Sequence, residues 1–130
     1  MAKTAAELVD EAKQRVENLN VDQVVAERER GDVLLVDLRE PGERAQQGAI
    51  PGAIHAPRGM LEFWADPSSS YHRPEFDPNQ RVVLYCASGG RSALAADTLQ
   101  QMGYTNVAHL DGGFNAWQAA GQPVEDAPLE

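Results

Sequence analysis

The sequence predicts an α/β fold with a central, mostly parallel β-sheet flanked by helices on both faces. Continuous apolar runs, such as VLLVDL (33–38) and RVVLY (81–85), alternate with segments of helical periodicity. These runs lack polar alternation, as is typical of parallel strands that are buried on both faces. The length of 130 residues is that of one domain.

The first half of the chain has clear helix start and stop signals. A helix is expected over residues 5–18, because Thr4 and Glu7 have capping-box spacing and apolar residues then recur every three or four positions. Asn20 and Gln23 repeat that start signal, and Gly31 ends a second, short helix. The run at 33–38 predicts a buried strand, and residues 52–57 a shorter one.

The second half continues the alternation after a long irregular segment. Strands are expected at 81–85 and 106–110, each followed by a helix, at 92–102 and at 114–120. Residues 58–80 hold three prolines and three consecutive serines, so they predict a loop with at most a turn or two of helix. A loop of that length in a compact domain is usually functional or disordered.

Composition excludes several classes of function. The net charge of −9 argues against a general nucleic-acid or anionic-membrane binder. A single cysteine forms no internal disulfide, and no apolar run approaches the roughly 20 residues of a membrane span. The N-terminal segment is too acidic for a signal peptide, so we expect a cytoplasmic protein. The three histidines and the cysteine lack zinc-ligand spacing, so no metal site is expected.

The stretch RVVLYCASGGRSALAA (81–96) carries the chemistry. Cys86 follows a buried strand, at the carboxyl edge of the sheet where ligands bind in such folds. Small residues and glycines then let the backbone turn its N–H groups inward, and a helix begins behind them. Because Arg91 stands at the start of that helix, the surroundings favour a thiolate and an anion. A lone cysteine is more often a buried apolar filler, but this order of elements favours a nucleophile.

Four segments resemble the rhodanese-like domains in their single-domain form: LLVDLREPGE, GAIPGAIHAP, VLYCASGGRSALAA and HLDGGFNAW. The resemblance implies a rhodanese-like domain over residues 20–123, an N-terminal helical extension over 1–19 and a C-terminal tail over 124–130. The chain departs from the family pattern at Ala49, where a histidine is usual, and at Arg44, where an aromatic residue often stands. These departures concern the packing of residues 44–50.

The resemblance also implies sulfur transfer, of the thiosulfate sulfurtransferase type. Cys86 would take a sulfane sulfur from thiosulfate or a persulfide and pass it to cyanide or to a thiol, including a protein thiol, without metal or organic cofactor. A thiolate attacks sulfur well, and loop amides can stabilise the anionic persulfide. The implied catalytic residues are Cys86 and Arg91, and the implied substrate-binding residues are Ala87, Ser88, Gly89, Gly90 and Arg58. The sequence does not define the oligomeric state.

Two alternatives remain open at this point. Cysteine-dependent phosphatases and arsenate reductases of related folds hold tetrahedral oxyanions in a similar loop. Those phosphatases have five residues between cysteine and arginine, whereas four residues lie between Cys86 and Arg91. The shorter cradle favours a single sulfur over a phosphate group. The other alternative is a catalytically silent rhodanese-like binding module, against which the intact cysteine and arginine argue.

Other polar residues have weaker assignments. Asp37 and Arg39 are expected to support the site, with loop bracing favoured over a direct chemical role. His55 and His109 are expected in the core or at a sheet edge, and His72 could approach the site. The glycines of DGGF (111–114) are explained by a tight turn.

The apolar residues of segment 58–74 predict either a wall beside the active-site loop or a cap on the core away from it. In the first case Arg58 would add positive charge where an anionic donor binds. The sequence does not decide between the two.

Overall fold

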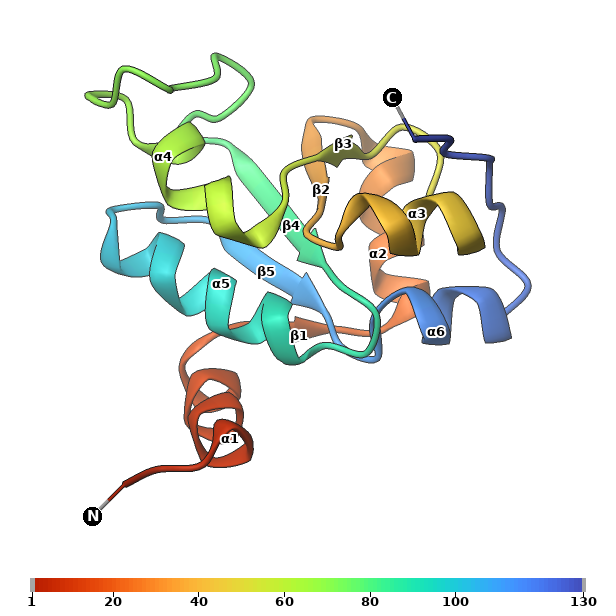
Figure 1. The fold of residues 1–130 in the computed structure, drawn as a ribbon, viewed down its shortest axis with the longest axis horizontal. Helices are drawn as coiled ribbons and strands as arrows, with labels where there is room; N and C mark the ends of the chain where they lie inside the picture. Colours follow the sequence, from red (N-terminus) through yellow and green to blue (C-terminus); the bar gives the residue numbers. More distant parts are fainter. Residues whose placement is uncertain (1, 130) are drawn as a thin grey trace.

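The protein folds around a five-stranded parallel sheet with strand order β1-β5-β4-β2-β3, seen in Figure 1. The computed structural model describes residues 2–129. The strands are β1 (Glu17–Leu19), β2 (Val33–Asp37), β3 (Ile54–His55), β4 (Arg81–Tyr85) and β5 (Val107–Leu110). The predicted α/β class and parallel sheet are confirmed.

Helices cover both faces of the sheet. They are α1 (Ala5–Arg15), α2 (Val21–Arg30), α3 (Pro41–Gln47), α4 (Leu61–Ala65), α5 (Gly90–Gln101) and α6 (Gly113–Ala119). One core cluster joins β2 and β4 to α4 and α5, and a second joins the opposite side of the same strands to α2 and α6. Because side chains alternate along a strand, β4 supplies Val82 and Leu84 to the first cluster and Val83 and Tyr85 to the second.

The first predicted helix was too long. Helix α1 has the expected capping box at Thr4 but ends at Arg15, and Glu17–Leu19 forms the edge strand β1 beside β5. Three residues of the segment predicted as a helical extension therefore belong to the sheet. Residues 17–19 form a strand because the edge of β5 offers them backbone hydrogen bonds. A tertiary contact of this kind overrides the local helical pattern.

Other element boundaries differ by a few residues. The strand predicted over 52–57 contains only Ile54–His55, and helix α5 begins at Gly90 rather than at residue 92. Helix α6 spans Gly113–Ala119, close to the predicted 114–120. The long segment 58–80 contains a short 3-10 turn (Arg58–Met60) and α4, which agrees with at most a turn or two of helix.

The connections place the site at a switch point of the sheet. From β2 the chain passes through α3 to β3 on one side, and from β4 it passes through α5 to β5 on the other. The connections leave the carboxyl ends of these two neighbouring strands in opposite directions. In parallel sheets such a point opens the crevice in which ligands bind.

The C-terminal residues lie against α3 and the loop that follows it. Ala49 and Glu125 form an isolated antiparallel bridge through two backbone hydrogen bonds of 2.8 and 2.9 Å. Ala49, which replaces the usual histidine, is buried there. Within residues 2–129, every helix is too short or too polar to span a bilayer.

Candidate active site

The loop after β4 surrounds the sulfur of Cys86 with hydrogen-bond donors. The side chain is 1 % exposed, and its Sγ accepts backbone N–H groups from Gly89 at 3.2 Å and Ser92 at 3.4 Å. Ser92 lies in the first turn of α5, which begins at Gly90. Its N–H and the positive end of the helix dipole therefore point at the sulfur.

The start of α6 holds this loop from behind. The N–H of Phe114 donates to the carbonyl of Cys86 at 2.8 Å, and the N–H of Asn115 donates to the carbonyl of Ala87 at 3.0 Å. Since these carbonyls point toward α6, the following N–H groups are free to face the sulfur. The sequence explained Gly113 by a tight turn, but the structure gives a second reason for the glycine. A Cβ at this position would lie 2.5 Å from the Cys86 carbonyl oxygen, so only glycine lets α6 approach the loop this closely.

Two opposing effects set the acidity of Cys86. Burial raises the pKa of the thiol, because a charge is poorly solvated in the interior. Hydrogen bonding with the Ser92 side chain, and hydrogen bonds from the N–H groups of Ser92, Gly89 and Ser88, lower the pKa and outweigh burial. The net result is a pKa below the usual value for a cysteine, as a nucleophilic sulfur requires.

Arg91 forms a two-pronged ion pair with Glu43 of α3. Its Nη1 and Nη2 donate to the two carboxylate oxygens at 2.9 and 2.8 Å. The hydrogen bonds from Arg91 lower the pKa of Glu43 to about 2. Glu43 was part of the sequence motif but had no predicted role. It links α3 to α5 and offsets part of the positive charge that Arg91 offers an anion.

A chain of buried polar groups leads away from the sulfur on the other side. Ser92 Oγ lies 3.6 Å from Cys86 Sγ and 2.8 Å from Nδ1 of His109 on β5. Nε2 of His109 lies 2.7 Å from Oδ1 of Asn18 on β1. Burial lowers the pKa of His109 to about 4, so the imidazole is neutral at neutral pH.

Sequence reasoning placed His109 correctly in the core but missed this contact. A lone histidine in a short apolar strand gives no signal for it. Ser92, directly after Arg91 in the motif, was the available sign that its hydroxyl would lie near the sulfur.

Asp37 and Arg39 form a fully buried ion pair at the carboxyl end of β2. Arg39 donates to both oxygens of Asp37, at 3.1 and 2.9 Å, and Tyr85 donates its hydroxyl to the same carboxylate at 2.9 Å. The Arg39 guanidinium lies 4.1 Å from the centroid of the Phe114 ring. The N–H of Phe114 binds the Cys86 carbonyl, so the pair lies behind the residue that holds the loop. A supporting role for Asp37 and Arg39 stays a prediction.

Arg58 and segment 58–74 make contacts of a different kind. Arg58 forms an ion pair with Glu62 at 2.7 Å, while Leu61 and Ala65 are buried in the core cluster beneath α5. Trp64 lines a cavity of about 360 Å³ together with residues of α3, β3 and the C-terminal tail, and His72 bonds to the carbonyl of Phe76 at 3.1 Å. These contacts fit a cap on the core. A role for Arg58 in donor binding stays a prediction.

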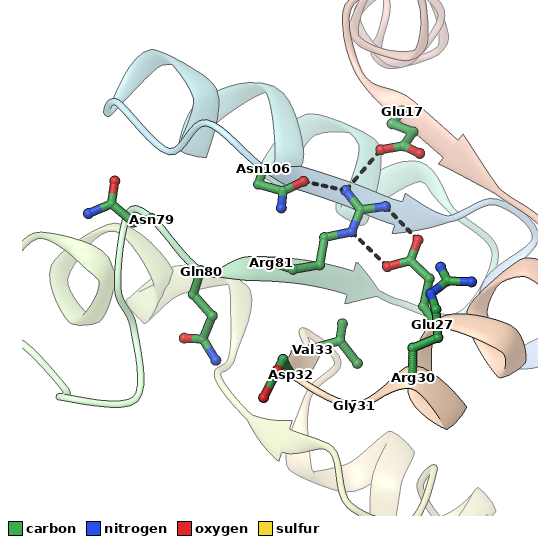
Figure 2. Close-up of a pocket in the computed structure, with 10 residues that line it drawn as sticks. All are labelled: Glu17, Glu27, Arg30, Gly31, Asp32, Val33, Asn79, Gln80, Arg81 and Asn106. Atoms are coloured by element: carbon green, nitrogen blue, oxygen red, sulfur yellow. Dashed lines mark hydrogen bonds and ion pairs between the residues drawn. The ribbon is translucent and has the colours of Figure 1, made fainter.

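A second polar region lies at the opposite edge of the sheet. A cavity of about 740 Å³ lies beside Arg81, the first residue of β4. Figure 2 shows the residues that line it. Arg81 donates to Glu27, Glu17 and Asn106, so its guanidinium is satisfied by the protein. The ten residues that line this cavity include no cysteine, serine or histidine.

Fold and site together define a class: parallel α/β domains in which a cysteine follows a central strand, in a loop that ends at an arginine on the next helix. The chain belongs to one family of that class, because the model of the rhodanese-like domain matches residues 20–120. It is similar to a sulfurtransferase of Allochromatium vinosum, with 38 % identity over 84 % of this chain and 92 % of the relative.

Two solved structures extend the comparison. A protein of unknown function from Rhodopseudomonas palustris, described as a possible tyrosine phosphatase, has a TM-score of 0.91 and 45 % identity, with 96 % of each chain covered. The homodimeric polysulfide-sulfur transferase of Wolinella succinogenes has a TM-score of 0.75 and 29 % identity, covering 91 % of this chain and 84 % of that one.

Proposed function

We propose that the protein is a sulfurtransferase that carries a sulfane sulfur as a persulfide on Cys86. The observation that carries the proposal is the environment of the sulfur: a buried Sγ that accepts N–H groups from Gly89 and Ser92 at a helix N-terminus, with a lowered pKa. Relatives named as sulfurtransferases support it.

With thiosulfate as donor, the Cys86 thiolate attacks the outer sulfur. A new S–S bond forms, the bond to the sulfonate sulfur breaks, and sulfite leaves with the electron pair. The anionic outer sulfur of the persulfide accepts hydrogen bonds from the loop N–H groups of residues 87–91. Arg91, on the rim, binds the sulfonate oxygens of the donor with its planar guanidinium.

In the second half of the cycle, cyanide or a thiolate attacks the outer sulfur. The S–S bond breaks and Cys86 returns as a thiolate. Cys86 is the only cysteine in the 130 residues, so the acceptor thiol comes from another molecule, either a small thiol or a protein. The chemistry uses no metal or organic cofactor.

The decisive test is intact mass after incubation with thiosulfate. We expect a gain of one sulfur atom, which a reducing thiol removes, and no gain in Cys86→Ser. Failure of the wild type to gain sulfur from either thiosulfate or a persulfide donor overturns the proposal, and a gain in Cys86→Ser excludes Cys86 as the carrier.

The description of the Rhodopseudomonas palustris structure makes phosphatase activity the second candidate. The spacing between Cys86 and Arg91 is one residue shorter than in cysteine-dependent phosphatases, which favours sulfur over phosphate. Aryl-phosphate hydrolysis measured beside sulfur transfer to cyanide distinguishes the two. Efficient hydrolysis that disappears in Cys86→Ser would replace the sulfurtransferase proposal.

A further inference from the structure

The hydroxyl of Ser92 has one proton and two partners. Cys86 Sγ lies 3.6 Å from its oxygen, and Nδ1 of His109 lies 2.8 Å from it. All three side chains are buried. Because one proton cannot serve both partners, its position decides whether Ser92 presents a lone pair or a proton to the sulfur.

Asn18 decides which nitrogen of His109 carries the proton. Its Nδ2 donates to the carbonyl of Lys13 at 2.9 Å and to that of Val16 at 3.1 Å. The amide oxygen therefore faces His109 Nε2 at 2.7 Å, and that nitrogen must be the donor. In the neutral ring Nδ1 is then an acceptor, so the Ser92 hydroxyl donates to His109.

The resting arrangement follows from this tautomer. With its proton directed at His109, Ser92 Oγ offers only lone pairs to Cys86. That geometry suits a neutral thiol, whose S–H donates to Ser92. A thiolate in the same place would face a lone pair, unless the Ser92 proton turned or moved.

We propose that Asn18, His109 and Ser92 form a proton relay that ionises Cys86. The thiol proton passes from Sγ to Ser92 Oγ, while the original Ser92 proton passes to Nδ1 of His109. The products are a thiolate that accepts a hydrogen bond from Ser92 and an imidazolium that donates to Ser92 and to Asn18. No proton is lost or gained. Ser92, which contacts the sulfur, is catalytic, whereas His109 and Asn18 are positioning residues.

The surrounding charges act on both groups of the pair. Burial lowers the pKa of His109, which keeps the ring neutral at rest and opposes the transfer of the proton to it. Asp111, after β5, favours the imidazolium, and Lys13 of α1, which is ion-paired with Asp111, opposes it. Arg91 favours the thiolate and is itself paired with Glu43, while Asp97 of α5 is paired with Arg15. The new thiolate stabilises the new imidazolium, so the macroscopic pKa values belong to the pair.

Asn18 extends the relay beyond the part of the chain that the family model matches. It lies on β1, before residue 20, where the match to the family model begins. Its side chain joins the end of α1 to the sheet, so the N-terminal segment contributes to the chemistry of the loop. The inference rests on Cys86 being the reacting group of the proposed function.

The direct test is the pH dependence of Cys86 reactivity in the wild type. The thiolate is followed by the rate of alkylation with iodoacetamide, since Cys86 is the only thiol. Because the internal transfer from Cys86 to His109 releases no proton, the amount of thiolate that it forms does not depend on pH as long as His109 is neutral at rest. We expect the alkylation rate below the pKa of Cys86 to level off at a pH-independent plateau instead of falling tenfold per pH unit. A rate that keeps falling tenfold per pH unit down to about pH 5 overturns the relay.

Variants supply a second readout. His109→Asn keeps a polar side chain but accepts no proton, and Ser92→Ala keeps the backbone N–H to the sulfur. We expect each to abolish the plateau, lowering the alkylation rate at pH 5 about tenfold, and the double variant to match the singles because the residues act as one unit. A folded His109→Asn with the wild-type profile contradicts the proposal.

These measurements use no sulfur donor, so they separate the two proposals. If the wild type shows the plateau and His109→Asn lacks it, but thiosulfate and persulfides never load the cysteine, the relay stands and the sulfurtransferase function falls. If the cysteine loads with sulfur but no plateau exists, the function stands and the relay falls.

Discussion

An arginine lies near each end of strand β4, but only one of them lies beside a cysteine. At the amino end, Arg81 of β4 is held by Glu27, Glu17 and Asn106 beside an open cavity of about 740 Å³, whose lining is drawn in Figure 2. Beyond the carboxyl end, Arg91 of α5 is held by Glu43, next to a buried sulfur.

The difference shows that cavity size does not mark the site in this fold. The amino ends of the strands present no helix N-terminus to the cavity and no nucleophile among its lining residues. At the carboxyl ends, the loop N–H groups, α5 and α6 converge on one sulfur. The chemistry follows the direction of the strands and helices, because a parallel sheet aligns all their positive helix ends on one edge.

The largest expected effect comes from comparing a glycine near each end of the sheet, Gly113 at the carboxyl edge and Gly31 at the amino edge. Both Gly113 and Gly31 have positive φ, so alanine strains either backbone. Only at Gly113 would the new Cβ meet backbone, 2.5 Å from the Cys86 carbonyl oxygen, while nothing lies within 4 Å at Gly31.

We expect Gly113→Ala to lower kcat/KM about 100-fold and to cost about 3 kcal/mol of stability, because both strain and overpacking apply. Gly31→Ala should lose stability by strain alone and keep its kcat. Sulfur transfer to cyanide and urea unfolding measure both. Equal kcat in the two variants would show that α6 does not shape the loop.

The two arginines give the next largest effect. Arg91→Ala should lower kcat/KM for thiosulfate about 100-fold and Arg91→Lys about 10-fold, because lysine offers a point charge in place of two parallel donors. Arg81→Ala should keep kcat/KM within about twofold but lose roughly 2 kcal/mol of stability, since it leaves the largely buried Glu27 unpaired. Steady-state kinetics and urea unfolding separate these outcomes. If both Arg91 variants lose little kcat/KM, and by the same factor, Arg91 stabilises the loop and does not bind the donor.

The smallest effect concerns Glu43 and acid. Arg91 lowers the pKa of Glu43 from 4.5 to about 2, so the folded state stabilises the ionised carboxylate more than the unfolded state does. This contribution is present above about pH 4.5 and is lost as the pH falls toward 2. Glu43→Gln should therefore be less stable than wild type at pH 7, with a difference in unfolding free energy that narrows as the pH falls from about 4.5 toward 2.

The same variant releases Arg91 for an anion, so its KM for thiosulfate should fall a few-fold at pH 7. Urea unfolding at several pH values and steady-state kinetics measure the two effects. A stability difference that is independent of pH would mean that the ion pair does not contribute to folding.

Much of the site could be predicted because it is local. The strand RVVLY, Cys86, the glycine loop and the start of α5 are contiguous, so their order alone places the sulfur at a helix N-terminus. The Asp37–Arg39 pair is also local, since its members are two positions apart in the sequence. Its burial beneath Phe114 was not visible, because α6 reaches it from the far end of the chain.

What the sequence determined by itself was the alternation of strands and helices, the parallel sheet and the position of Cys86 on its carboxyl edge. Periodicity and turn residues act over neighbouring positions and can be read directly. The tertiary structure alone decided that residues 17–19 form a strand, that Glu43 meets Arg91, and that His109 meets Ser92 and Asn18. In these contacts the two partners are separated by between 17 and 91 positions in the sequence. The contacts depend on strand order, register and side-chain direction, which no local pattern specifies.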